Sequence, residues 1–343
     1  MSNLDYQFAS DNAAGVCPEV WAALAAANSG SAPSYGADDY SLRARRLMSE
    51  VFETDCEVFF VSSGTAANAL ALSALGRSHE SVLCHESAHI ETDECGAPEF
   101  FTGGSKVLPL TGPHGKLSVT AVQAALERGH GFHFPKPGTL SLTQSTESGT
   151  IYRPAEIAAL ADLAHAQGMR VHMDGARFAN AAAALGADGV SPADLTWKSG
   201  VDVLSFGGTK NGMLTTEAIV FFRREWAQDF AYRAKQAGQV GSKQRFAGAQ
   251  WAAMLQDGAW LRYAAHANRC AALLADRVRA GGKVPVMFQP EVNAVFLELQ
   301  PELVSRLEQR WAFYHFFGER GYRFMCSWAT PVAAVEELVS ALG

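Results

Sequence analysis

Short, apolar, β-prone runs alternate along the chain with polar turns and with alanine- and leucine-rich stretches of helical spacing. This alternation extends from about Phe59 to Phe222. The expected strands are a run ending at Val61 and residues 81–84, 107–110, 138–144, 169–173, 201–206 and 218–222. The expected helices begin just after Thr65 and span residues 119–127, 154–167 and 180–185. Because strand, helix and strand recur in this order, the sequence predicts an α/β domain with a largely parallel sheet.

The pattern changes on both sides of this region. Before it, a helix is expected from Pro18 to Ala27, and Ser41 is expected to cap a second, amphipathic helix. After it, one long helix is expected from about Ala249 to Arg279, preceded by a basic, glycine-containing connector. The other expected elements are helices over 225–236, 301–318 and 332–342 and strands over 284–288, 294–299 and 322–328. This mixture predicts a smaller α+β unit at the C-terminal end.

The length and these patterns predict three parts of the chain. A chain of 343 residues is long enough for two hydrophobic cores. We expect residues 28–250 to form a large domain and residues 251–343 a small C-terminal domain. Residues 1–27 are expected to be an N-terminal segment that packs on the small domain.

The composition restricts the class of protein. Hydrophobic residues make up 48% of the chain and charged residues 18%, and the formal net charge of −7 without a basic cluster argues against a nucleic-acid partner. No apolar run approaches a membrane span, and the N-terminus lacks the features of a signal peptide, so we expect a cytoplasmic protein. The six dispersed cysteines are expected to be reduced thiols. His85 and His89 have no second cluster of ligand residues, so no metal is expected.

Polar side chains follow the expected strands at the point where each strand ends. They are Ser63 to Thr65, His89, Glu147, Asp174 with Arg177, and Lys210. Because the carboxyl ends of parallel strands meet at one edge of a sheet, we expect these groups to share a site. The turn from Ser63 to Thr65 joins a strand to a helix, where free N–H groups and the helix dipole favour an anion. The alternative for this turn is an ordinary capped helix start.

Lys210 is the one cation in a polar, glycine-rich turn between two β-prone runs. A lysine held between buried strands loses hydration and is prone to a lowered pKa, which makes it a candidate nucleophile for Schiff-base chemistry. The alternative is a solvated lysine on a hairpin. Similar alternatives stay open elsewhere, since Asp174 and Arg177 would also suit a helix start with a surface ion pair.

Together these groups match the requirements of pyridoxal phosphate (PLP). The cofactor needs a lysine for its Schiff base, an anion site for its phosphate and a carboxylate against its pyridine nitrogen. Lys210, the Ser63–Thr65 turn and Asp174 would supply these three, and His89 would stack on the ring. The order of these groups in one α/β domain is more specific than any one of them.

Several motifs extend this pattern over nearly the whole chain. They are Ser10-Asp11, Tyr35-Gly36 with Asp38-Asp39, Ser63-Gly-Thr-Ala-Ala-Asn68, Ala88-His89 with Glu94, His172-Met-Asp-Gly-Ala-Arg177, residues 202–212, Arg245 and Arg323. In these motifs the chain resembles the PLP-dependent L-threonine aldolases of the low-specificity type. The resemblance implies fold type I, the aspartate aminotransferase fold. In this fold, helices sandwich the mainly parallel sheet of a large domain, and a small α+β domain follows.

The resemblance also implies residue roles. Lys210 would form the Schiff base, His89 would stack on the ring, and Asp174 would pair with the pyridine nitrogen. The phosphate would be held by Ser63, Gly64 and Thr65, together with Arg245 from a neighbouring subunit of a homotetramer. The substrate would be bound by Ser10, Tyr35, Arg177 and Arg323, and Arg177 would also contact the cofactor.

Two departures from the family pattern concern specificity. Many members have a histidine before a glycine where this chain has Glu147-Ser-Gly149, and many lack the polar Asn211 beside the lysine. The base for the substrate hydroxyl would then be Glu147, His89 or a water. The implied reaction is retro-aldol cleavage of L-threonine and related β-hydroxy-α-amino acids to glycine and an aldehyde. The alternatives are a β-eliminating lyase or an aminotransferase on the same fold, and a non-enzymatic PLP-fold binding protein.

Overall fold

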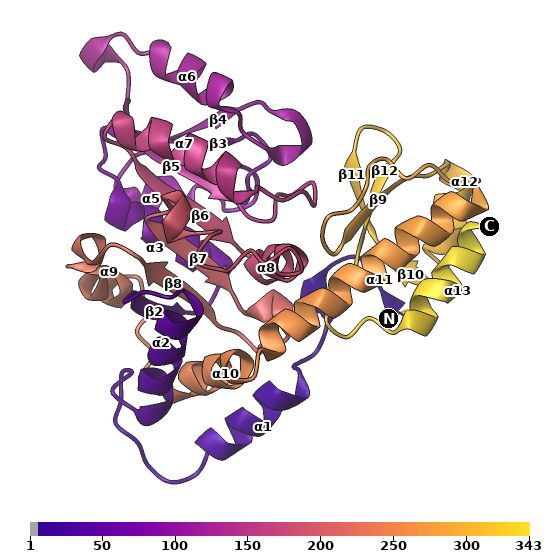
Figure 1. The fold of residues 1–343 in the computed structure, drawn as a ribbon, viewed down its shortest axis with the longest axis horizontal. Coiled ribbons are helices and arrows are strands. Elements are labelled where there is room, and N and C mark those ends of the chain that lie inside the picture. Colours follow the sequence, from indigo (N-terminus) through magenta and orange to yellow (C-terminus); the bar gives the residue numbers. More distant parts are fainter. Residues whose placement is uncertain (1–5) are drawn as a thin grey trace.

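The computed structural model describes residues 6–343, so the first five residues of the predicted N-terminal segment lie outside the described part. Its centre is a seven-stranded sheet in the order β2-β8-β7-β6-β5-β3-β4 (Figure 1). The strands are β2 (Glu57–Val61), β3 (Glu80–His85), β4 (Lys106–Leu110), β5 (Lys136–Thr143), β6 (Arg170–Gly175), β7 (Val203–Gly207) and β8 (Glu217–Phe221). All neighbours pair in parallel except β8, which is antiparallel to both β7 and β2. The prediction of a largely parallel α/β sheet is confirmed.

Helices cover both faces of this sheet because its strands are apolar on both sides. In β8, Ile219 and Phe221 pack with Leu70 of α3 (Gly64–Leu75) and Phe230 of α9 (Phe230–Gln236). The alternate residues of β8 pack into the main core on the other face. That face carries α2 (Asp39–Val51), α7 (Pro154–Ala166), α8 (Phe178–Gly186) and α10 (Arg245–Gln256). Further helices beside the sheet are α4 (His89–Thr92), α5 (Ala97–Thr102) and α6 (Val119–Glu127).

A second core forms around a three-stranded antiparallel sheet of order β11-β12-β9. Its elements are β9 (Ala294–Glu298), α12 (Pro301–Leu307), β10 (Trp311–Ala312), β11 (Tyr314–Phe317), β12 (Gly321–Met325) and α13 (Val332–Leu342). The N-terminal strand β1 (Tyr6–Gln7) pairs in parallel with β10, which brings Phe8 into this core, and α1 (Pro18–Ala27) follows. The helix α11 (Ala259–Gly281) joins both cores, because Trp260 packs in the first and Leu274 in the second. The predicted boundary between residues 250 and 251 stays a prediction.

Two predicted helix boundaries were wrong for local reasons. Asp38, and not Ser41, caps α2: its carboxylate accepts hydrogen bonds from the Ser41 N–H and hydroxyl, each at 2.8 Å. The expected long helix is two helices, since α10 ends at Gln256 and α11 begins at Ala259. Gly258 between them has φ 65°, a left-handed conformation that interrupts a helix.

Two predicted elements near the C-terminus were also wrong. The helix expected over 301–318 ends at Leu307, and the aromatic run after it forms β10 and β11. The strand expected over 284–288 is reduced to a single bridge between Val286 and Leu297. Antiparallel pairing with β12 holds β11 as a strand, because aromatic side chains fit a pleated sheet surface better than a helix. Within residues 6–343 no helix is both long and apolar enough to cross a membrane.

Candidate active site

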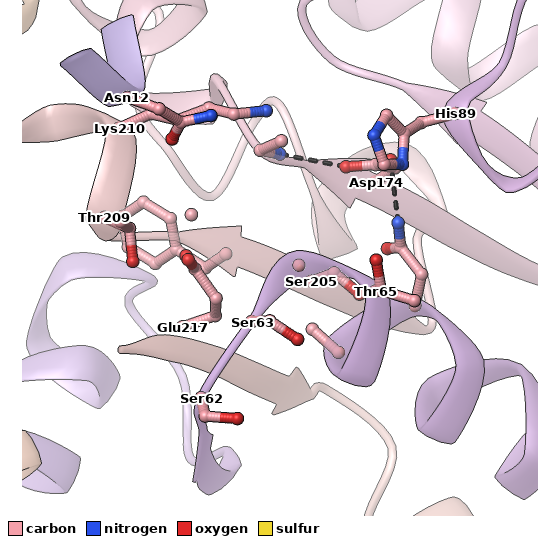
Figure 2. A pocket seen from close by; sticks show the side chains of 16 residues that line it. Asn12, Ser62, Ser63, Thr65, His89, Asp174, Ser205, Thr209, Lys210 and Glu217 are labelled. Carbon is pink, nitrogen blue, oxygen red and sulfur yellow. Dashed lines mark hydrogen bonds between the residues drawn. The ribbon is translucent and has the colours of Figure 1, made fainter. Parts of the chain in front are cut away.

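The carboxyl ends of the parallel strands surround a cavity of about 240 Å³, here called the inner cavity (Figure 2). Because β8 runs in the opposite direction, its first residue, Glu217, lies at the same edge. The polar side chains that line the inner cavity are those of Asn12, Ser62, Ser63, Thr65, Asn68, His89, Asp174, Ser205, Thr209, Lys210 and Glu217. The sequence prediction that Ser63–Thr65, His89, Asp174 and Lys210 share one site therefore agrees with their placement.

The first turn of α3 presents an anion-binding surface to the inner cavity. Ser63 is the N-cap and its hydroxyl accepts from the Ala66 N–H at 3.2 Å, while earlier N–H groups of the turn have no intrahelical acceptor. A Cβ built on Gly64 would meet nothing within 4 Å, so open space lies in front of this backbone. Gln239 holds the preceding residue, Ser62, by accepting from its N–H and hydroxyl, each at 2.9 Å.

Lys210 lies in a tightly packed loop between β7 and β8. A Cβ on Gly207 would collide with the Ala176 carbonyl oxygen, so the strand end must approach that backbone closely. Asn211 is buried, and its side chain donates to the Trp260 carbonyl at 2.9 Å, which anchors the loop to α11. The amino group of Lys210 points into the cavity (Figure 2) and has no hydrogen-bond or ion-pair partner within residues 6–343. The polar residue that departs from the family pattern thus holds the loop in place.

A hydrogen-bonded chain connects Asp174 to His89. Asn68 donates to Asp174 Oδ2 at 2.9 Å and to Glu94 Oε1 at 2.8 Å, and Glu94 Oε1 lies 2.8 Å from His89 Nδ1. The hydrogen bond to Glu94 raises the pKa of His89, against the effect of burial. Burial also raises the pKa of Glu94. The pair therefore keeps a proton to higher pH than an isolated histidine would.

The other Asp174 oxygen, Oδ1, accepts from the Ala176 N–H at 2.9 Å. Below the cavity, His172 is fully buried between the hydroxyls of Ser141 and Ser205, at 2.9 Å and 3.0 Å. Burial lowers the pKa of His172 to about 4, so this ring is neutral and orients Ser205. The His-Met-Asp motif thus supplies both a structural histidine and the carboxylate that faces the cavity.

A second cavity adjoins the first and shares Asn12, His89 and Lys210 with it; it is here called the outer cavity. Its other lining residues are Ser10, Ser87, Thr92, Asp93, Glu147, Arg177, Tyr314, His315, Phe316, Phe317 and Arg323. The residues predicted at the substrate end, Ser10, Arg177, Arg323 and Glu147, are thus close together, although they come from distant parts of the chain.

The two arginines of the outer cavity, Arg177 and Arg323, have different interaction partners. Arg177 makes a bidentate contact with Asp11, at 2.8 Å and 3.0 Å. Burial lowers the pKa of Arg177, but the carboxylates of Asp11, Glu147 and Asp174 together raise it above its ordinary value. Burial lowers the pKa of Arg323, whose guanidinium lies 4.7 Å from the Phe316 ring centroid and whose Nε has no partner within residues 6–343. Glu147 Oε2 lies 4.0 Å from Nη1 of each arginine. The arginines therefore face a common point that already attracts a carboxylate.

The polar groups that line the inner cavity are complementary to those of PLP. Open space faces the N–H groups of α3, Asp174 presents a carboxylate, and Lys210 presents an amine without a partner within residues 6–343. Two buried atoms in the adjoining network, Asn68 Oδ1 and Glu94 Oε2, also lack a hydrogen-bond partner within the described residues. A polar, anionic ligand with a basic ring nitrogen would be complementary to this set.

Comparison with known proteins agrees with this geometry. The family model of beta-eliminating lyases matches residues 7–302. The chain belongs to this family. Its relatives include the low specificity L-threonine aldolases of Pseudomonas aeruginosa, 54% identical over 98% of this chain and 97% of the relative, and of a Pseudomonas species, 52% identical over 99% and 98%. A solved structure of Leishmania major threonine aldolase has a TM-score of 0.91 at 27% identity and covers 98% of both chains. The predicted fold type I architecture is confirmed.

Two residues with predicted roles, Tyr35 and Arg245, do not line either cavity of their own chain. Tyr35 is 57% exposed and has the Lys235 amino group 5.2 Å from its ring centroid. Arg245 begins α10, and not a connector, and its Nε donates to the Ala27 carbonyl at 3.0 Å. The roles that the resemblance gave them stay predictions.

The sequence interpretation gave no role to four residues that shape the lyase site. Asn68 and Glu94 form the chain between Asp174 and His89, Asp11 fixes Arg177, and Glu217 lines the inner cavity. The first three lay inside the motifs that carried the resemblance, but polar residues near a turn have no specific signal of their own. Glu217 had no signal at all, because only the antiparallel direction of β8 brings it to the site.

Proposed function

We propose that the protein is a PLP-dependent aldehyde-lyase, a threonine aldolase that cleaves L-threonine, L-allo-threonine and related β-hydroxy-α-amino acids to glycine and an aldehyde. The observation that carries this proposal is the joining of two cavities at Lys210. The inner cavity suits PLP, and the outer cavity presents two arginines to an anion. The names of the curated relatives support the same reaction.

The residues of the inner cavity would hold the cofactor. Ser63, Gly64 and Thr65 would bind the phosphate, Asp174 would keep the ring nitrogen protonated, and Lys210 would bind the aldehyde carbon. His89 would lie against the ring, with Glu94 fixing its orientation. When bound, PLP supplies an electron sink for the charge that develops as the Cα–Cβ bond breaks.

The residues of the outer cavity would hold the amino acid. Arg177, with Ser10 and Arg323, would bind the substrate carboxylate, and Asp11 keeps Arg177 in one orientation. Holding the carboxylate at one place orients the rest of the substrate, which is how an enzyme of this kind selects the bond that breaks. The aromatic side chains of Tyr314, Phe316 and Phe317 in β11 line this side of the site.

Two further parts of the proposal concern the assembly and its place in the cell. Tyr35 and Arg245 do not line the cavities of their own chain, so we propose that they act on a neighbouring subunit of a homotetramer, Tyr35 on substrate and Arg245 on phosphate. We also propose a cytoplasmic location, which the six free cysteines support because such thiols persist in a reducing compartment.

Aldehyde release tests the proposed reaction. Purified protein supplied with PLP is expected to produce glycine and an aldehyde in equal amounts from L-threonine, L-allo-threonine and phenylserine, without a 2-oxo acid. Both enantiomeric series should be assayed, and activity confined to the D-isomers would contradict the proposal. Release of ammonia with 2-oxobutyrate would identify a β-eliminating lyase, and a requirement for a 2-oxo acid acceptor would identify an aminotransferase.

Glu147→Gln tests the base that takes the hydroxyl proton. The hydrogen bond to Glu94 raises the pKa of His89, so this ring keeps its own proton to a higher pH; we therefore propose Glu147, which lines the same cavity. The substitution is expected to lower kcat by roughly 10²-fold or more with little change in KM, measured as aldehyde release. Glu86→Gln changes an exposed glutamate that precedes the cavity-lining Ser87, and it should leave kcat unchanged. An unchanged kcat in Glu147→Gln would move the role to His89 or to water.

A further inference from the structure

Glu217 is a buried carboxyl group at the edge of the inner cavity, and the proposed reaction gives it no role. As the first residue of β8, it pairs with Val61 of β2 and with Gly207 of β7. Val61 leads directly into the turn that carries Ser63. Glu217 therefore lies at the phosphate end of the cavity, where its side chain and Ser63 line the same space (Figure 2).

The loop that carries Lys210 holds this carboxyl group in place. Glu217 Oε2 accepts from the Gly208 N–H at 2.6 Å, and Thr209 also hydrogen-bonds to the carboxyl group. Burial raises the pKa of Glu217, and these hydrogen bonds and the charge of Lys210 only partly oppose that effect. Glu217 consequently keeps its proton to a higher pH than an exposed glutamate.

Whether Glu217 is protonated affects how well the inner cavity binds an anionic ligand. Among the residues within 6–343 that line this cavity, Lys210 and His89 have basic side chains, while Asp174 and Glu217 both carry carboxyl groups. An ionised Glu217 would repel a phosphate at the first turn of α3, since two like charges in one buried site disfavour each other. A protonated Glu217 removes this repulsion and has an O–H group that can donate a hydrogen bond.

This inference rests on the proposed function and concerns its phosphate site. We propose that Glu217 is a cofactor-binding residue that holds a proton while the phosphate monoester is bound. A dianionic phosphate ester then binds together with one proton, which solvent delivers to the Glu217 carboxylate when that group is ionised beforehand. Cofactor affinity is consequently linked to pH through Glu217.

Other titratable groups around the cavity must be separated from Glu217. They are Lys210 from the loop itself, Asp174 from β6 and His89 from α4. Asp11, on the short helix that packs against the lysine loop, is paired with Arg177. The ligand for the test is pyridoxine 5′-phosphate, which has no aldehyde and therefore does not react with Lys210. Ionisation of its ring and of its phosphate contributes equally to the pH dependence of binding in wild type and in a Glu217 variant.

The test compares wild type with Glu217→Gln as full-length apoproteins. The glutamine side chain of this variant would keep an oxygen acceptor for the Gly208 N–H but would not ionise. The Kd for pyridoxine 5′-phosphate is measured by calorimetric titration between about pH 6.5 and about pH 9, where the phosphate is mainly a dianion. The affinities are expected to be similar at the low end, and wild type is expected to bind about tenfold more weakly than the variant at the high end.

Controls separate this inference from the proposed function. Glu57→Gln makes the same charge change on β2 at a half-exposed site, and its ratio to wild type should not change with pH. The role of Glu217 would be overturned if the Kd ratio of wild type to Glu217→Gln did not change with pH. It would also be overturned if the same pH-dependent ratio were found with pyridoxine, which lacks the phosphate. Either result would leave the proposed function intact. A wild type that binds neither PLP nor pyridoxine 5′-phosphate would overturn the proposed function itself.

A measurement on wild type alone guards against a variant that does not fold. Inorganic phosphate is titrated into the apoprotein at about pH 8.5, above the second phosphate ionisation, in two buffers with different ionisation enthalpies. The difference in heat gives the number of protons taken up on binding. Net uptake is expected, and no uptake or a release of protons would contradict the proposal.

Discussion

Replacing Lys210 by alanine is expected to abolish the visible absorbance band of the lysine-bound cofactor and to lower kcat by roughly 10⁴-fold or more. The reason is that Lys210 Nζ is the amine that both cavities share, and within residues 6–343 it has no other partner. Alanine keeps the Cβ of the lysine, so the loop backbone is expected to stay in place. The measurement is an absorbance spectrum of purified protein supplied with PLP, followed by aldehyde release from L-threonine.

Lys198→Ala is the matched control for this prediction. Lys198 forms surface ion pairs with Glu53 and Asp194, so its loss should leave the absorbance band and kcat unchanged. If cofactor-supplemented wild type lacked the band, the PLP assignment itself would be wrong. If Lys210→Ala retained the band, another amine would hold the cofactor.

Asp174→Asn is expected to give the second largest loss, about 10²- to 10⁴-fold in kcat. The amide has nearly the shape of the carboxylate, but its single oxygen can accept from only one of the two donors, the Ala176 N–H or the Asn68 amide. The substituted side chain also carries no charge and cannot keep a ring nitrogen protonated. The loss should therefore lie in kcat and in the absorbance spectrum, while KM changes little.

Asp202→Asn provides a control for the cost of altering a buried aspartate. Asp202 is also buried and accepts from the Val171 N–H, but it does not line either cavity. Its variant is expected to lower the melting temperature without lowering kcat in folded protein. Equal kcat values for Asp174→Asn and wild type would remove Asp174 from the cofactor site.

The sequence predicted most of the elements around the site because their signals are local. The helices α1, α6 and α13 have the predicted bounds, and the strands that lead into Ser63, His89, Asp174 and Lys210 lie where periodicity placed them. Alternating apolar runs set the type of element, and polar residues at strand ends mark the edge where a site forms. The errors arose where a contact that periodicity does not encode decided the outcome: Asp38 caps α2, and pairing with β12 turned the end of a predicted helix into β11.

The same division holds for the site. The sequence by itself determined the groups with specific motifs, Lys210, Asp174, His89 and the Ser63–Thr65 turn, because their chemistry depends on residue type and on position after a strand. Only the tertiary structure decided which partners fix them: Asp11 on Arg177, Asn68 and Glu94 between Asp174 and His89, and Glu217 beneath the lysine loop. Such partners come from segments up to 166 residues apart and are selected by burial, since a polar group removed from water requires a hydrogen-bond partner wherever the fold supplies one.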